Sequence, residues 1–325
     1  DRPQTVAAWR RRSPTVSDNP VFWREIRRPL VTRRWQAIAM ATLIGGVLVF
    51  FYVCMAINTE LGNRNWQMPF ACIFCGLLTL LACIISATAI AQEKESDTWT
   101  LLLSSPLTSR QIVLGKLAGL LRRLLWPSIL IVLHFLLFGL GGVLNWTTVW
   151  VILYLTFSTN IIWVATGLYF SLRLKTVTFA IILNLCVTAA LYGLAPILLG
   201  ITGVFFYRTD TGAEIVGLYV PYAYMCSAIE SLNDRHNGYN YNYNAQFTRT
   251  DNLLARKLWV PVFGQIRATD FLAIVFVVGL AYLLLTTLVV WYTIRSFNNI
   301  VGRAGQLDRQ ANQLDTLTSA EPLAM

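Results

Sequence analysis

Residues 69–91 read PFACIFCGLLTLLACIISATAIA, an apolar run without a charged side chain. A helix needs roughly 20 such residues to cross the hydrocarbon core of a bilayer. Five further runs of this kind occur in the chain, at about residues 37–57, 125–144, 148–171, 178–204 and 271–294. None of the six contains Asp, Glu, Lys or Arg in its interior. The sequence therefore predicts an all-α polytopic membrane protein with six transmembrane helices.

The composition points to the same class of protein. Of the 325 residues, 56% are hydrophobic and 13% are charged, whereas about 25% of the residues of a soluble domain are charged. This excludes a soluble globule, a disordered chain and a disulfide-rich scaffold. The net charge of +10 would suit a nucleic-acid partner, but nine of the 26 basic residues lie in the first 36. Since the apolar runs hold none, the charge indicates a basic cytoplasmic rim and no nucleic-acid partner.

Basic residues also predict the orientation of the spans. Residues 1–36 hold nine of them and the loop 92–124 holds five, whereas the loop 58–68 holds one. Because loops rich in Lys and Arg stay in the cytoplasm, both termini are expected there. The chain then divides into a basic cytoplasmic segment, a six-span domain with an outer loop at 205–270, and a cytoplasmic tail. Their boundaries are residues 1–36, 37–294 and 295–325.

Three features are expected on the outer side. The fifth span is interrupted by Gly193, Pro196 and Gly200, which predicts a kink or break in its outer third, because proline lacks a backbone donor. Residues 220–232 predict a short helix that folds back onto the outer membrane face. Residues 239–244 alternate Tyr and Asn, which is typical of a flexible loop more than of a ligand platform.

A short amphipathic helix is predicted at residues 18–30, on the inner membrane surface. Its apolar side chains recur every four residues, at Phe22, Ile26 and Leu30. Its arginines lie off that stripe, at Arg24, Arg27 and Arg28. We expect Phe22 and Ile26 to contact lipid and the three arginines to lie near anionic headgroups.

Residues 92–116, QEKESDTWTLLLSSPLTSRQIVLGK, follow the second span. An acidic cluster comes first, then a short apolar run from Trp99 to Leu103, which Ser104, Ser105 and Pro106 end. Thr108 with Gln111 then predicts a capping box that begins another helix. Residues 92–111 therefore predict two short helices joined by a proline turn, here called the elbow. Exposed leucines there would need a cover of lipid or of a protein partner.

The elbow resembles the segment after the second span of ATP-binding-cassette (ABC) type-2 permeases. The resemblance rests on Glu-x-Glu at 93–95, LLSSPLTSR at 102–110 and LGK at 114–116. Asn19-Pro20-Val21 followed by Arg-Glu-Ile-Arg at 24–27 is similar to the N-terminal helix of the same family. The likeness extends over roughly residues 18–300. The chain departs from the family pattern at Asp97, where the family often has glycine before the threonine.

This resemblance implies the permease subunit of an ATP-driven exporter in the bacterial inner membrane. Two six-helix protomers would form the path, and a separate ATPase subunit would bind ATP and sit on the elbow. The residues implied to contact the ATPase are Glu93, Glu95 and Arg110 through polar groups and Trp99, Leu102 and Leu103 through apolar ones. Membrane lipid is the remaining partner. For the elbow, a helix pair that merely joins two spans stays open. For the protein, a non-transporting anchor that docks a cytoplasmic complex is the alternative, and a membrane enzyme comes third.

No catalytic, cofactor-binding or metal-binding residue is expected in this chain. Residues 115–117 are Gly-Lys-Leu, whereas a phosphate-binding loop needs Ser or Thr after the lysine. Cys72-x-x-Cys75 lies in an apolar span without a second ligand pair, which favours ordinary packing over zinc. His134 is the only histidine in a span, and a hydrogen-bonded core position is favoured for it over one that lines a path. Most of the six cysteines lie in apolar runs, so no disulfide framework is expected.

Overall fold

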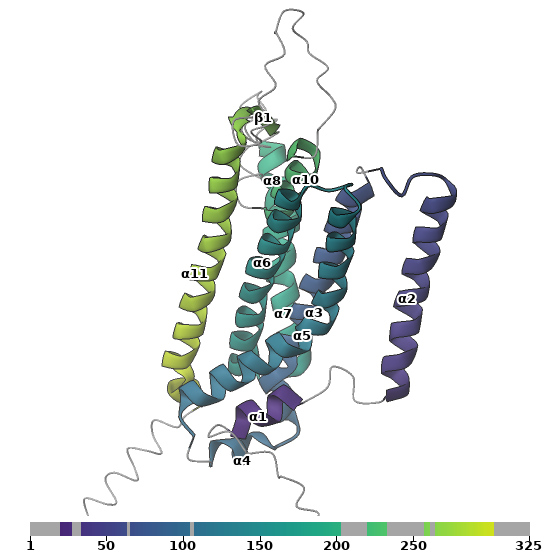
Figure 1. The fold of residues 1–325 in the computed structure, drawn as a ribbon. Coiled ribbons are helices and arrows are strands. Elements are labelled where there is room, and N and C mark those ends of the chain that lie inside the picture. The colour runs from purple at the N-terminus through teal and green to yellow at the C-terminus, as the bar shows by residue number, and fades with distance from the viewer. Residues whose placement is uncertain are drawn as a thin grey trace, which may run out of the picture.

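The structure is a computed structural model, and it describes residues 20–27, 34–63, 66–104, 107–202, 220–232, 257–260 and 264–301. The described part is a bundle of long helices with short elements at both ends (Figure 1). The long helices are α2 (Arg34–Ile57), α3 (Gln67–Glu95), α5 (Ser109–Leu140), α6 (Trp146–Arg173), α7 (Val177–Ala189) and α11 (Ala268–Val301). At one end lie α1 (Pro20–Arg27) and α4 (Trp99–Leu103), and at the other lies α10 (Pro221–Leu232).

Five apolar helices are long enough to cross a membrane: α3, α5, α6, α11 and the continuous stretch Val177–Leu198. They coincide with five of the six predicted spans. The first predicted span corresponds to α2, whose 24 residues give a length of about 36 Å. The apolar stretch described within it, Thr42–Ile57, is shorter than the others. A membrane-type fold built mainly of helices is thus confirmed, and the count of six spans stays a prediction.

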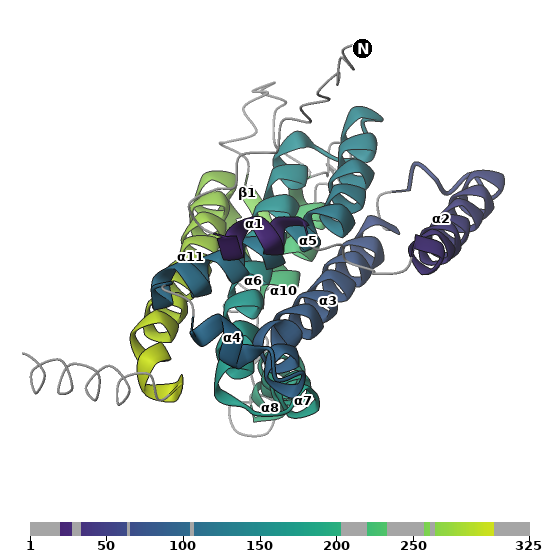
Figure 2. The same cartoon turned by 90° about the horizontal axis from the view of Figure 1, so that it is seen from below.

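The centre of the bundle is α6, which packs on α3 and α11 (Figures 1 and 2). Small residues allow this close approach: a Cβ added at Gly167 would overlap Ser86 of α3, and one added at Gly279 would overlap the Tyr154 ring. A polar side chain joins α7 to α3, since Asn184 Nδ2 donates to the Cys83 carbonyl at 3.2 Å. Such small and polar contacts are typical of helix interfaces in membranes.

By contrast, α2 stands apart from the bundle over much of its length (Figures 1 and 2). Apolar side chains such as Trp35 and Phe50 are largely exposed. Its contacts lie near its C-terminal end, where Tyr52 hydrogen-bonds His134 Nδ1 and lies beside Phe70. His134 Nε2 lies 3.1 Å from Gln67 Oε1, which confirms the prediction of a hydrogen-bonded core histidine.

The fifth predicted span is interrupted as expected. After α7 ends at Ala189 the chain forms a π-helical turn, η2 (Ala190–Leu194), and then α8 (Ala195–Thr202). Gly193 lies in the π turn, and Pro196, which has no backbone N–H to donate, follows it.

The described part of residues 205–270, the predicted outer loop, holds one confirmed helix and one element that the sequence reasoning missed. The predicted helix at 220–232 is confirmed as α10. A small antiparallel hairpin of β1 (Lys257–Val260) and β2 (Gly264–Arg267), with Trp259 opposite Gln265, was not predicted. Residues 239–244 lie outside the described part of the chain.

Candidate functional site

The end of the bundle that carries α1 and α4, here called the base, holds most of its buried charge. There α1 lies across the first half of α5 (Figure 2). The Glu25 side chain of α1 is buried against α5, and Arg123 Nη2 donates to its Oε2 at 2.7 Å. Gly119 makes the close approach possible, because a Cβ built there would lie 2.5 Å from the Glu25 Cβ.

A second carboxylate, Glu93 at the end of α3, joins the same group of charges. Arg24 Nη2 donates to Glu93 Oε1 at 2.7 Å and to Glu25 Oε1 at 3.2 Å. Lys116 Nζ lies 2.8 Å from Glu93 Oε2 and 3.5 Å from Glu25 Oε1. These residues form the basal ion-pair network: Arg24, Glu25, Glu93, Lys116 and Arg123.

Burial decides the energetic weight of this network. Lys116 is only 1% exposed, Glu25 4% and Glu93 8%. Exposed ion pairs contribute 0–1 kcal/mol, but removing one partner of a buried pair costs about 3–5 kcal/mol, because a charge is left without water or a counter-ion. Lys116 also donates to the Ala89 carbonyl at 3.0 Å. The network therefore ties α1, α3 and α5 together at their base.

Glu93, Lys94 and Glu95, here called the charged triplet, each contact a different neighbour of α3. Glu93 joins α1 and α5 through the network. Lys94 Nζ donates to carbonyls at the end of α6, those of Ser171 at 3.2 Å and of Leu174 at 3.0 Å. Glu95 Oε1 accepts the Val177 backbone N–H of the first residue of α7 at 2.7 Å. Consecutive helical residues point about 100° apart, so this last turn of α3 reaches four helices.

The turn of the elbow depends on an unusual backbone conformation. Asp97 has φ of 56°, in the left-handed region that glycine adopts at little cost and that Asn and Asp tolerate best among other residues. On either side, the hydroxyls of Ser96 and Thr98 each donate to the Glu93 carbonyl at 3.3 Å. This turn therefore favours glycine, asparagine or aspartate at position 97.

The apolar residues of α4 are less accessible than the sequence suggested. Trp99 and Leu102 are buried, and the Trp99 ring lies against Phe297 of α11 with centroids 6.0 Å apart. Leu103 is partly buried. The expectation of exposed leucines is therefore wrong for Leu102, which joins the hydrophobic core. The end of α11 covers part of Trp99.

The polar surface of the elbow remains open. Glu95 and Arg110 are exposed, and the predicted capping box of Thr108 and Gln111 is confirmed. The contacts of all these residues with an ATPase stay a prediction.

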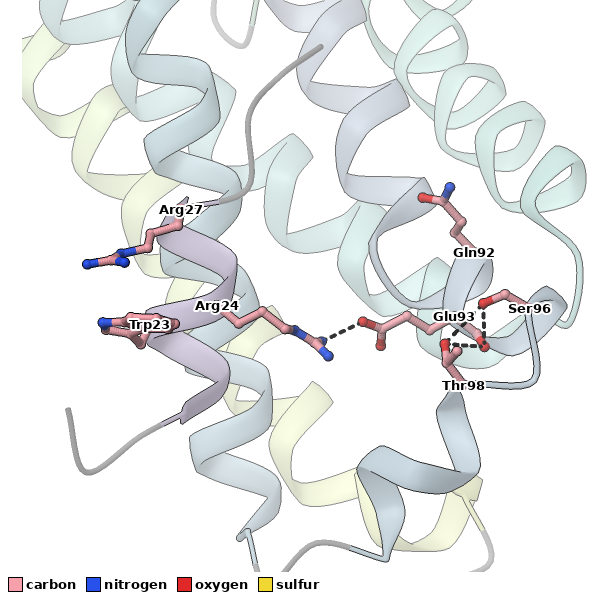
Figure 3. Close-up of a pocket in the computed structure, with 7 residues that line it drawn as sticks. All are labelled: Trp23, Arg24, Arg27, Gln92, Glu93, Ser96 and Thr98. Carbon is pink, nitrogen blue, oxygen red and sulfur yellow. Dashed lines mark hydrogen bonds and ion pairs between the residues drawn. The ribbon is translucent and has the colours of Figure 1, made fainter. Parts of the chain in front are cut away.

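A cavity of about 510 Å³ lies between α1 and the elbow (Figure 3). Arg24 reaches across it to Glu93, and the Arg27 guanidinium stacks on the Trp23 ring at 4.0 Å. Its other lining residues are Gln92, Ser96 and Thr98. Arg24 thus meets protein carboxylates where lipid headgroups had been expected, whereas Phe22 and Arg27 are exposed. The side chain of Ile26 and the whole of Arg28 lie outside the described part, and lipid contact by this helix stays a prediction.

Sequence reasoning missed Glu25, Lys116, Gly119 and Arg123. One signal was present: the last three lie three and four residues apart, which places them on one face of a helix. Glu25 lies among arginines in α1 and is a natural counter-ion for Lys116 and Arg123. What the sequence could not give was the crossing of α1 over α5.

No group of three or more His, Cys, Asp or Glu side chains suited to a metal ion occurs within the described ranges. The site is therefore a junction of helices, built from ion pairs and helix ends.

A protein-family model matches most of the chain. The model described as "ABC-2 family transporter protein" matches residues 38–299. No curated protein matches. The family match includes all the long apolar helices apart from the first residues of α2 and the last two of α11. The chain therefore belongs to the ABC-2 transporter family and is a multi-pass membrane permease of that transport system.

Proposed function

We propose that the chain is the permease subunit of an ATP-driven exporter, which pairs with a second permease protomer and is driven by a separate ABC ATPase. The charged triplet carries this proposal. A partner that moves the elbow acts on one turn of α3, and this turn contacts α1, α5, α6 and α7. Movement of the elbow is thereby passed to most of the bundle.

The placement of basic residues supports an elbow on the cytoplasmic side. The base carries most of the described Lys and Arg residues, among them Arg24, Arg27, Lys94, Arg110, Lys116, Arg123, Arg173 and Arg295. The opposite end carries Lys257 and Arg267 of the hairpin. Since the cytoplasmic rim of a membrane protein is the basic one, the base faces the cytoplasm, where ATP is available, and α2 is the first of six spans.

Docking of the ATPase is tested at exposed charges of the elbow. Glu93 is a poor choice, because its reversal would break the basal network. The reversal Arg110→Glu changes an exposed group, and we expect it to weaken co-purification of a co-expressed ABC ATPase at least tenfold. Arg173→Glu, exposed at the same end on α6, is the matched control. Unchanged capture of the ATPase by Arg110→Glu would contradict docking at the elbow.

Orientation is tested by labelling single cysteines in a cysteine-free background. An impermeant maleimide on intact cells should label a cysteine placed at position 240 and leave one at position 175 unlabelled until the membrane is opened. Labelling of position 175 from outside would overturn the proposed topology. This test needs neither the ATPase nor a cargo, so it separates the topology from the coupling.

A further inference from the structure

Two cysteines far apart in the sequence meet at the end of the bundle opposite the base. Cys72 lies in the second turn of α3 and Cys226 in the middle of α10, and their Sγ atoms are 3.7 Å apart. Both side chains are partly exposed. A disulfide needs an S–S distance of about 2.05 Å, so an approach of roughly 1.7 Å, within the reach of small side-chain rotations, would join them.

The remaining contacts of α10 hold this pair in place. The Tyr222 hydroxyl lies 3.1 Å from Thr79 Oγ1. On α10, Tyr222 is one turn before Cys226, and on α3, Thr79 is two turns after Cys72. On its other face, α10 accepts a hydrogen bond from Thr148 Oγ1 at the Ala228 carbonyl, at 3.3 Å. The helix is therefore fixed on both α3 and α6, antiparallel to α3, with the two thiols in register.

The other thiols near this place have different partners. Cys75 lies one turn from Cys72, but its Sγ lies 2.9 Å from Thr156 Oγ1 on α6. Cys83 Sγ lies 3.2 Å from Thr188 Oγ1 on α7. The geometry thus singles out Cys72 with Cys226, and not the Cys72-x-x-Cys75 spacing that stands out in the sequence.

We propose that Cys72 and Cys226 are a disulfide-forming site that on oxidation joins α10 covalently to α3. The proposal rests on the orientation proposed above, in which this end of the bundle faces away from the cytoplasm, because disulfides persist in oxidising compartments. The oxidant is the disulfide of a thiol–disulfide oxidoreductase. One thiolate attacks that disulfide to form a mixed disulfide, and the second thiolate attacks the mixed disulfide and displaces the thiolate of the oxidoreductase. Two electrons pass to the oxidoreductase, its two sulfurs take up the equivalent of the two thiol protons, and it leaves as the dithiol.

The bond would act on the same helix as the charged triplet. Cys72 and Glu93 lie on α3, near its two ends. A disulfide at position 72 would hold α10 to α3 while the elbow moves the other end. It also closes a loop of 154 positions, which includes the outer segment before α10, and long loops gain most from a cross-link.

The test reads the redox state in native membranes, without a partner or a cargo. Free thiols are trapped with N-ethylmaleimide before lysis, and the chain is digested without reductant and analysed by mass spectrometry. We expect a peptide pair linked through 72 and 226 in most of the protein, which separates after reduction. Cys72→Ser and Cys226→Ser should each abolish the link, and Cys186→Ser, an exposed cysteine on α7, should keep it.

A second measurement compares the thermal stability of the oxidised and the reduced protein. The purified wild-type protein should melt roughly 5 °C higher when oxidised than when reduced with a phosphine. The double variant Cys72→Ser/Cys226→Ser should melt at one temperature under both conditions. Alkylation of both wild-type thiols in unreduced membranes would overturn the proposal. Failure of the ATPase to bind would leave this result untouched, so the two proposals fail separately.

Discussion

The two ends of α3 are held by different chemistry. At the base, Glu93 meets the charged groups of Arg24 and Lys116. Toward the other end, neutral groups meet one another: Gln67 with His134, Cys72 with Cys226 and Thr79 with Tyr222. An unpaired buried charge costs more than an unpaired neutral group. Single substitutions should therefore destabilise the protein more at the base than at the outer end.

The largest effect is expected for Lys116→Met, which keeps most of the side-chain volume and removes the charge shared by Glu25 and Glu93. The free energy of unfolding should fall by about 3–5 kcal/mol, as measured by denaturation of the purified protein in detergent. Arg110→Met removes an exposed charge from the same helix and should change it by less than about 1 kcal/mol. Equal losses in the free energy of unfolding for the two variants would show that burial does not decide how much the network stabilises the protein.

Gly119→Ala tests whether the approach of α1 to α5 is needed for that network. The new Cβ would meet the Glu25 Cβ at 2.5 Å and its backbone carbonyl carbon at 3.1 Å, so α1 must shift, at a cost of roughly 1–3 kcal/mol. Gly76→Ala on α3 has no atom within 4 Å of the new Cβ and should stabilise the helix by up to about 1 kcal/mol. In thermal melts, the melting temperature should fall for Gly119→Ala and rise for Gly76→Ala. A rise for Gly119→Ala would refute the close approach of α1 to α5.

At the neutral end, Tyr52→Phe keeps the ring beside Phe70 and removes the hydroxyl that hydrogen-bonds His134. The expected loss is about 1 kcal/mol, read from the same denaturation curves. His134→Phe in the Tyr52→Phe background removes the other partner, so the second loss should be smaller than that of His134→Phe alone. A loss for Tyr52→Phe as large as that for Lys116→Met would reverse the ranking of the two ends.

The smallest effect is expected at Asp97, on the turn just beyond the charged end. Asp97→Gly relieves the positive φ of 56° but adds freedom to the unfolded chain, so the net change should stay within about 1 kcal/mol. Asp97→Val places a β-branched residue in the same conformation and should cost about 1–2 kcal/mol. A higher melting temperature for Asp97→Val than for Asp97→Gly would show that the turn adopts another conformation.

The sequence predicted the features that depend on local composition or neighbouring residues, and it missed those that depend on contacts between distant helices. The apolar helices depend on composition, because a backbone in lipid must satisfy its own hydrogen bonds. Five of the six predicted spans overlap these helices, but α5 begins 16 residues before its predicted span and α11 ends seven residues after its own. The capping box and the broken fifth span depend on neighbours in sequence and were also predicted. The basal network was not, since Glu25 and Glu93 meet only through the crossing of three helices. The cover over Trp99 comes from α11, almost 200 positions away.

The charged triplet has a consequence for how this region can change. Its three contacts depend on the rotational phase of α3, because each residue reaches its partner only from its own side of the helix. Inserting or deleting one residue before Glu93 would turn the triplet by about 100° and direct every side chain to the wrong neighbour. The length of α3 up to this point is therefore fixed more strictly than its composition. In a chimera that exchanges elbows between permeases, the number of residues between the centre of α3 and the elbow should be kept, even where the sequences differ.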